Sequence, residues 1–200
     1  MVKRFIKYYK PHMKLFILDL FCAFLVSAID LIFPIITKQV LNEYIPDGVL
    51  KIVIIIGCSL FVLYALRFLL NYIIGYYGHV MGIRIETDMR RDLFHKYQKL
   101  DYQFFDDKKT GELLTNLTSH LHDVSEMSHH APEDIFISTL MLIGSFVYLL
   151  VFCNIYLTLI VFVFLAMLVT YSITRRKKML KVFREARNAQ GELNAKVESS

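Results

Sequence analysis

Residues 135–173 read IFISTLMLIGSFVYLLVFCNIYLTLIVFVFLAMLVTYSI, and they contain no aspartate, glutamate, lysine or arginine. As one α-helix this stretch would be roughly 58 Å long, about twice the thickness of a bilayer's hydrocarbon core. It is also far too apolar for the core of a water-soluble domain. Its apolar character is interrupted near the middle at Cys153-Asn154. The stretch therefore predicts two membrane helices folded back on each other, with a turn of a few residues at Cys153-Asn154.

Two further apolar runs, Leu15–Ile36 and Val49–Tyr77, raise the number of predicted spans to four. The whole chain is 56% hydrophobic and its mean hydropathy is +0.45, which is well above the balance of soluble proteins. The sequence therefore predicts an all-α membrane protein that crosses the bilayer several times.

The positive charges follow the spans. The net charge is +5, yet the basic residues gather before the first span, between the second and third, and after the fourth, whereas the two alternate loops hold only Lys51. By the positive-inside rule, both termini and the middle loop lie in the cytoplasm of a multi-pass cell-membrane protein. The basic excess is thus explained by topology, and we expect no nucleic-acid partner.

The polar segments next to the spans also have a helical pattern. Basic and apolar residues interleave before Pro11, which predicts an amphipathic elbow in the headgroup layer, with a frayed terminus as the alternative. After Tyr77 apolar residues recur every four positions, so the second helix should continue about 35 Å beyond the membrane. The expected segments are an elbow over 1–11, spans over 14–42, 49–100, 133–153 and 155–200, and a cytoplasmic loop over 101–132.

Asp30 and Arg67 are the ionisable residues deepest in the spans, at similar depths when counted from the turn near Pro46. Ionisable groups in a bilayer usually face a bundle interior or a water-filled cavity and pair with each other. We expect an intramembrane Asp30–Arg67 pair or a place on a substrate-facing wall; the alternative is that they snorkel or face other helices. Asp19, near a span end, is expected to snorkel.

Four histidines lie close together before the third span: His120, His122, His129 and His130. On a helix His122, Glu126, His129 and His130 would share one face, which raises the possibility of a metal site. Tight zinc sites need fixed geometry and supporting partners that a sequence does not reveal. The favoured interpretation is a hydrated helix face, and no metal ligand is assigned.

Gly75, Gly78 and Gly82 follow one another at helical spacing at the end of the second apolar run. Small residues in membrane helices permit close approach of a neighbouring helix. We interpret these glycines as packing positions, with a bend as the alternative.

From Arg90 a basic helix leads to Phe104-Phe105-Asp106, then after four residues to Gly111-Glu112-Leu113-Leu114, and the stretch closes with Asp123-Val124. This order and spacing resembles the membrane domain of ATP-binding-cassette (ABC) exporters of the six-helix type, close to multidrug and lipid exporters. Other matches are the elbow before Pro11, Pro34 with Lys38 and Asn42 near the outer end of the first span, and Gly191-Glu192-Leu193-Asn194-Ala195. The resemblance covers essentially the whole chain as the N-terminal part of such a domain, with four of its six helices.

In this family the first cytoplasmic loop holds a coupling helix that touches the nucleotide-binding domains. The resemblance places that helix at residues 111–124, and the residues expected to form it are Gly111, Glu112, Leu113, Leu114, Leu117 and Leu121. The residues themselves favour a helix, since Thr110 is a suitable N-cap and Glu112 lies at the positive end of the dipole. Asn116 and His120 depart from the family, which often has arginine and an acidic residue there.

The chain has no G-x-x-x-x-G-K-[ST] motif, so it carries no ATPase residues and no cofactor site of its own. The resemblance implies that ATP and Mg²⁺ bind to a separate nucleotide-binding domain. It also implies export of an amphiphilic drug, lipid or peptide by alternating access, with a second membrane half as partner in a homodimer or heterodimer. The alternative is a non-transport sensor or assembly module whose long cytoplasmic helices bind a partner.

Overall fold

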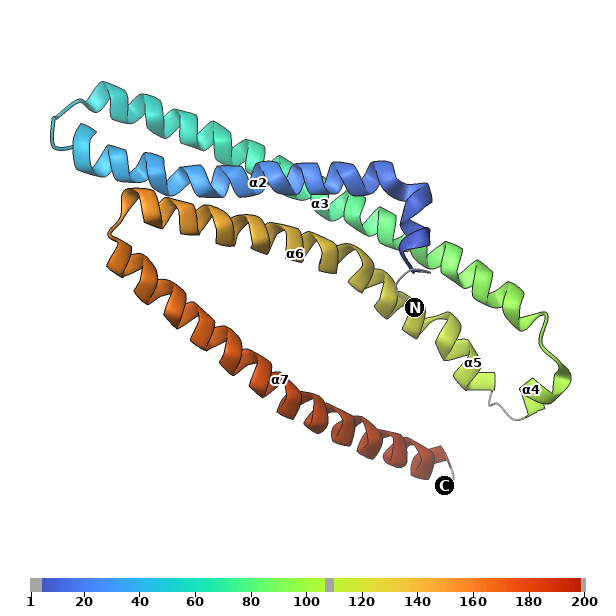
Figure 1. Ribbon diagram of the computed structural model, residues 1–200. Helices are drawn as coiled ribbons and strands as arrows, with labels where there is room; N and C mark the ends of the chain where they lie inside the picture. The colour runs from blue at the N-terminus through green and yellow to red at the C-terminus, as the bar shows by residue number, and fades with distance from the viewer. Residues whose placement is uncertain (1–4, 107–109, 199–200) are drawn as a thin grey trace. The chain divides into compact units, whose positions relative to one another are not determined.

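The structure, a computed structural model, describes residues 5–106 and 110–198, and every element found among them is helical (Figure 1). This confirms the predicted all-α class. The elements are the 3₁₀ helix η1 (Ile6–His12), α2 (Met13–Gln39), the π-helical turn η2 (Val40–Tyr44), α3 (Leu50–Tyr97), α4 (Tyr102–Asp106), α5 (Thr110–Leu117), α6 (Ser119–Phe152) and α7 (Ile155–Glu198).

Among the described residues, four helical stretches are long and apolar enough to cross a membrane, as predicted: Ile6–Tyr44, Leu50–Tyr97, Leu113–Phe152 and Ile155–Phe183. The chain is therefore a multi-pass membrane protein. The 48 residues of α3 correspond to a helix roughly 72 Å long, more than twice the thickness of a hydrocarbon core. Its second half is charged, so it extends well beyond the bilayer. We call the side where η1, α4 and α5 lie the polar end.

Helices α2 and α3 form an antiparallel hairpin, and the turn between them lies at the opposite end of α3 from α4 and α5 (Figure 1). The helical ladder widens at η2, where the amide of Ile45 donates to the carbonyl of Val40 at 3.1 Å. Gly48 then adopts a φ of +69°, a left-handed conformation that glycine takes without a steric penalty. The predicted turn around Pro46 is thus a short reversal that ends where α3 begins at Leu50.

The core of the unit formed by residues 1–145 lies between α2, α3 and the first part of α6. Buried side chains of α2 and α3 form its centre, and two residues of α6 pack against them: Cys22, Ala23, Val26, Ile29, Leu70 and Ile74, with Phe136 and Ile137. Gly144 of α6 also lies against Leu31 of α2, because a Cβ at position 144 would overlap the Leu31 side chain. Helices α2 and α3 pack closely, whereas α6 contacts them at a few positions, and each of the three exposes many apolar side chains elsewhere.

The end of the loop expected over 101–132 is helical and continuous with the third span. Helix α6 begins at Ser119 and continues through Pro132. A proline inside a helix lacks the amide that would bind the carbonyl four residues earlier, here that of Ser128. The Tyr9 hydroxyl of η1 donates a hydrogen bond to this carbonyl. The freed acceptor is thereby satisfied from another element, so the third span carries a polar extension like that of α3.

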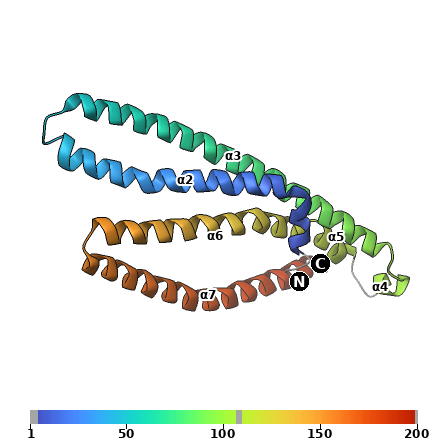
Figure 2. The same ribbon diagram turned by 45° about the horizontal axis from the view of Figure 1, so that its top comes forward.

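The second unit, residues 146–200, contains the end of α6 and all of α7. The turn at Cys153-Asn154 lies where the sequence predicted it (Figure 2). Asn154 begins α7 as an N-cap, because its side-chain oxygen accepts the amide of Tyr156 at 3.0 Å. Across the turn the rings of Phe146 and Phe162 meet edge to face, with centroids 4.8 Å apart. The hairpin is therefore held by a local cap and one aromatic contact.

Candidate functional site

The polar end of the first unit carries a short helix, α5, folded against the end of α3. Its side chains share a hollow of about 520 Å³ with aromatic residues of α3 and α4. The residues lining it are Phe94, Tyr97, Gln98, Leu100, Tyr102, Phe105, Leu113, Leu114 and Leu117. The apolar side chains of α5 therefore lie against residues of α3 and α4, and this contact sets the orientation of α5.

The predicted coupling residues fall into two groups. Leu114 lines the same hollow yet is 60% exposed, while Leu113 and Leu117 are half-buried. Leu121 is buried, at 7% exposure, and belongs to α6. The single helix expected over 111–124 is therefore wrong in extent, because α5 ends at Leu117 and the next turn starts α6. Gly111 and Glu112 belong to α5, and the surroundings of these two residues lie outside what the structure describes.

Arg90 of α3 holds the C-terminal end of α5. Its Nε donates to the carbonyl of Leu117 at 2.9 Å, and its guanidinium also pairs with Glu86 one turn earlier on α3. The last carbonyls of a helix have no partner within the helix, and a positive charge there also interacts favourably with the helix dipole. Arg90 therefore fastens the tip of the chain directly to the long helix α3.

Glu86 connects this contact to α6. The Glu86 residue is 9% exposed, and one of its carboxylate oxygens lies 3.5 Å from Nδ1 of His122. Glu86 thus links α3 and α6 at the point where α5 ends. Analysis of the sequence did not identify Arg90 or Glu86 as site residues. The signal that could have found them is their i,i+4 spacing on one helix face.

The structure brings Asp30 of α2 and Arg67 of α3 together in the apolar part of the hairpin. Arg67 donates twice, from Nε to Oδ1 at 2.7 Å and from Nη2 to Oδ2 at 2.9 Å. Such a bidentate pair is among the stronger charge-assisted hydrogen bonds. The guanidinium carbon also lies 5.8 Å from the centre of the Tyr64 ring. The side chains of Arg67 and Asp30 remain 34% and 26% exposed within this chain, so one face of the pair is open.

Two expectations about polar residues, one on α2 and one on α6, are wrong. Asp19 does not snorkel, because it is 1% exposed and packs beside Gly78. His129 is not on a hydrated face, because it is 3% exposed against the same helix α3. His120, His122 and His130 are exposed as expected. The difference arises because α2, α3 and α6 converge here, which the spacing along α6 alone does not indicate.

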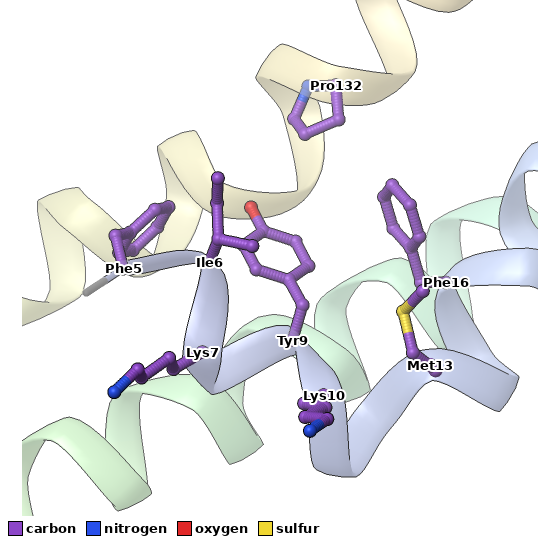
Figure 3. Close-up of a pocket in the computed structure, with 8 residues that line it drawn as sticks. All are labelled: Phe5, Ile6, Lys7, Tyr9, Lys10, Met13, Phe16 and Pro132. Atoms are coloured by element: carbon purple, nitrogen blue, oxygen red, sulfur yellow. The ribbon is translucent and has the colours of Figure 1, made fainter. Parts of the chain in front are cut away.

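The elbow is fastened to two other helices. Tyr8 donates to Asp92 at 2.8 Å, His12 lies 3.0 Å from Asp88, and Tyr9 bonds to Ser128 as described above. In Figure 3 Phe5, Ile6 and Tyr9 point toward the side of Pro132, whereas Lys7 and Lys10 extend away from it. These residues, with Met13 and Phe16, enclose an apolar hollow of about 590 Å³. The arrangement suits a segment with one apolar face and one cationic face.

Comparison with known proteins places this architecture in one family. Residues 16–200 match the family described as the ABC transporter transmembrane region. Over its whole length the chain is 38% identical to the ABC transporter ATP-binding protein YwjA of Bacillus subtilis. The aligned region covers 35% of YwjA.

Two lipid A-core flippases are also similar. An ATP-dependent lipid A-core flippase of Idiomarina loihiensis is 33% identical over 64% of the chain, which corresponds to 22% of that flippase. The flippase of Thiobacillus denitrificans is 25% identical over 98% of the chain, or 34% of its own length. The chain spans about a third of the length of the curated relatives that it matches most fully.

Proposed function

Because the chain belongs to the ABC transporter transmembrane-region family, we propose that it forms the first four helices of the membrane domain of an ATP-driven exporter. In this proposal both termini and the polar end lie in the cytoplasm, in agreement with the positive-inside rule. ATP and Mg²⁺ bind to a nucleotide-binding domain outside these residues. Alternating access then moves the substrate outward as that domain hydrolyses ATP.

The exposed Leu114 on a fastened α5 is the observation that carries this proposal. A helix that transmits force must be held firmly and must present an exposed docking surface. Arg90 supplies the first property through its hydrogen bond to Leu117, and Leu114 supplies the second. A single exposed leucine on a rigid helix is suited to insertion into an apolar groove of a partner domain.

The substrate and the second membrane half are also part of the proposal. Apolar side chains remain exposed along all four long helices, where lipid or further helices can contact them. A dimer of two six-helix halves with the substrate path between them would supply those helices. An amphiphilic substrate, with lipids favoured over drugs and peptides, is supported by the two lipid A-core flippases among the relatives. The open face of the Asp30–Arg67 pair would contribute polar groups to the path.

The test is a Leu114→Asp variant of the full-length protein in liposomes, with Met127→Asp as the matched control. Both residues are 60% exposed, but Met127 lies on α6 outside the hollow at the tip. We expect Leu114→Asp to lower transport and substrate-stimulated ATP hydrolysis at least about tenfold, since an aspartate in an apolar groove costs more than 1.4 kcal/mol. Membrane insertion should be unaffected.

Unchanged coupling in Leu114→Asp, or an equal loss in Met127→Asp, would contradict the role of α5. ATP hydrolysis that never responds to any amphiphile would favour the sensor or assembly module instead.

A further inference from the structure

Three histidines from two helices meet where the apolar parts of α3 and α6 end. His79 belongs to α3, and His129 and His130 belong to α6. One ligating nitrogen from each ring lies within 4.8 Å of those of the other two. The ring centres of His129 are 4.6 Å from His79 and 4.0 Å from His130. The sequence-based grouping with His122 is replaced, because His122 lies beside Glu86 and His79 takes its place.

The buried member of the cluster already has the orientation of a metal ligand. Nδ1 of His129 lies 3.3 Å from the carbonyl of Ser125. A carbonyl only accepts hydrogen bonds, so Nδ1 is the donor, and in the neutral imidazole Nε2 then presents its lone pair. Among the described residues this buried Nε2 has no hydrogen-bond partner. A histidine fixed through one nitrogen to a backbone carbonyl, with the other nitrogen free, is the usual arrangement around bound metals.

The backbone of α3 leaves room for this arrangement. A Cβ at Gly82 would lie 3.0 Å from Nδ1 of His129 and 3.1 Å from Oγ of Ser125, and a Cβ at Gly78 would lie 3.4 Å from Cδ2 of His129. The same Gly78 position is 3.6 Å from Oδ1 of Asp19, a second buried polar atom without a partner among the described residues. Two glycines thus admit the imidazole, and a carboxylate from α2 lies nearby. Unsatisfied buried polar atoms are rare, and a bound ion or an ordered water is one explanation for them.

Glu126 supplies a carboxylate next to the two exposed rings. Its oxygens lie 3.7 Å from Nδ1 of His79 and 3.8 Å from Nε2 of His130. Three mutually close imidazoles, with a carboxylate beside two of them, are a nitrogen-rich group that suits Zn²⁺ and similar borderline ions rather than Ca²⁺ or Mg²⁺. We propose that His79, His129, His130 and Glu126 bind a divalent transition-metal ion of the zinc class at the junction of α3 and α6.

Binding would draw the two helices together. Ligands about 2.0–2.1 Å from a tetrahedral ion are separated by roughly 3.3 Å, less than the 4.8 Å spread of the nitrogens. His79 and His130 are both half exposed and have the freedom to close this gap by changing rotamer. The ion would stabilise the conformation in which α3 and α6 are close at this level, since a ligand shifts the equilibrium toward the state that it binds better. This role is independent of the proposed transport function.

The test is a Co²⁺ titration of the full-length protein, purified in detergent with a tag that contains no histidine. Tetrahedral Co²⁺ gives visible ligand-field bands, and Zn²⁺ added afterwards should abolish them. We expect one ion per chain with micromolar or tighter affinity. His129→Ala and His79→Ala should each weaken binding about 100-fold, because even the loss of an outer-shell partner costs 10–100-fold. His120→Ala, an exposed histidine of the same helix, should bind as the unaltered protein does.

Loss of the buried His129 ring also disturbs packing, so Co²⁺ binding by His79→Ala is the decisive measurement for the metal site. His79 is half exposed, and its removal leaves the contacts of His129 with Ser125 and Gly82 in place. Absence of tetrahedral bands in the unaltered protein, or bands of equal strength in His79→Ala, would overturn the proposal.

Discussion

Replacing Arg90 by alanine tests how the tip of the chain is held, because one guanidinium serves partners on two helices. The change removes the hydrogen bond of 2.9 Å to the Leu117 carbonyl and the ion pair with Glu86. A hydrogen bond from a charged donor contributes a net 1.5–3 kcal/mol or so. The buried Glu86 would retain only His122 at 3.5 Å. We therefore expect the free energy of detaching α5 to fall by about 1.5–3 kcal/mol, which raises the detached population about 10- to 150-fold.

Hydrogen–deuterium exchange measured by mass spectrometry reads this population directly. Peptides covering residues 110–118 should exchange about tenfold faster or more in Arg90→Ala, whereas peptides from the α2–α3 core should not change. Arg91→Ala is the matched control. Arg91 lies 3.7 Å from Asp88 and its side chain is 65% exposed, and such surface pairs contribute little.

In Arg90→Lys the exchange rate of α5 should lie between the rates of the unaltered protein and Arg90→Ala. An ammonium group lacks the planar fork with which the guanidinium reaches a carbonyl and a carboxylate together. Exchange of α5 in Arg90→Ala at the rate of the unaltered protein would refute this reasoning. An equal acceleration in Arg91→Ala would refute it as well, since it would show a general charge effect in place of a specific cap.

Two further predictions concern the packing of the helices. Gly82→Ala should lower thermal stability by about 1–3 kcal/mol through overpacking against His129 and Ser125, while Gly75→Ala, with nothing within 4 Å of its added Cβ, should be neutral or slightly stabilising in a thermal-shift assay. Asp30→Ala and Arg67→Ala should each destabilise the detergent-solubilised protein. The loss in the double variant should be smaller than the sum of the two single losses, with a coupling energy of about 1 kcal/mol or more. Additive losses would contradict a direct pair.

Local sequence patterns were sufficient for the course of the chain through the membrane. Long apolar runs without charged residues predicted four spans, because hydrophobicity over about 20 residues is a sum over neighbours in the sequence. The turns at Asp47-Gly48 and Cys153-Asn154 were also predictable, since they depend on the conformational freedom of Gly48 and on the cap that Asn154 forms with Tyr156. The polar continuation of α3 followed from its helical periodicity in the same way.

The limits of sequence reasoning appear wherever a distant residue decides the outcome. The loop was expected to extend to residue 132, but α6 already begins at Ser119 and continues through Pro132, and Tyr9, 119 residues away from Ser128, satisfies the carbonyl that the proline leaves free. Leu121 looked like part of a docking stripe, yet it is buried within the chain. In both cases the local pattern was compatible with two structures, and a contact from another helix selected one of them.

The candidate site shows the same division. The sequence by itself determined the fold class, the spans and the short helix that presents Leu114, because these depend on composition and on periods of a few residues. Only the tertiary structure decided that Arg90 caps α5, that Asp30 meets Arg67, and that His79 joins His129 and His130. The physical reason is that these contacts depend on how far α2, α3 and α6 approach one another. That distance is set by side-chain volumes at positions such as Gly78, Gly82 and Gly144, and the spacing along any one helix does not contain it.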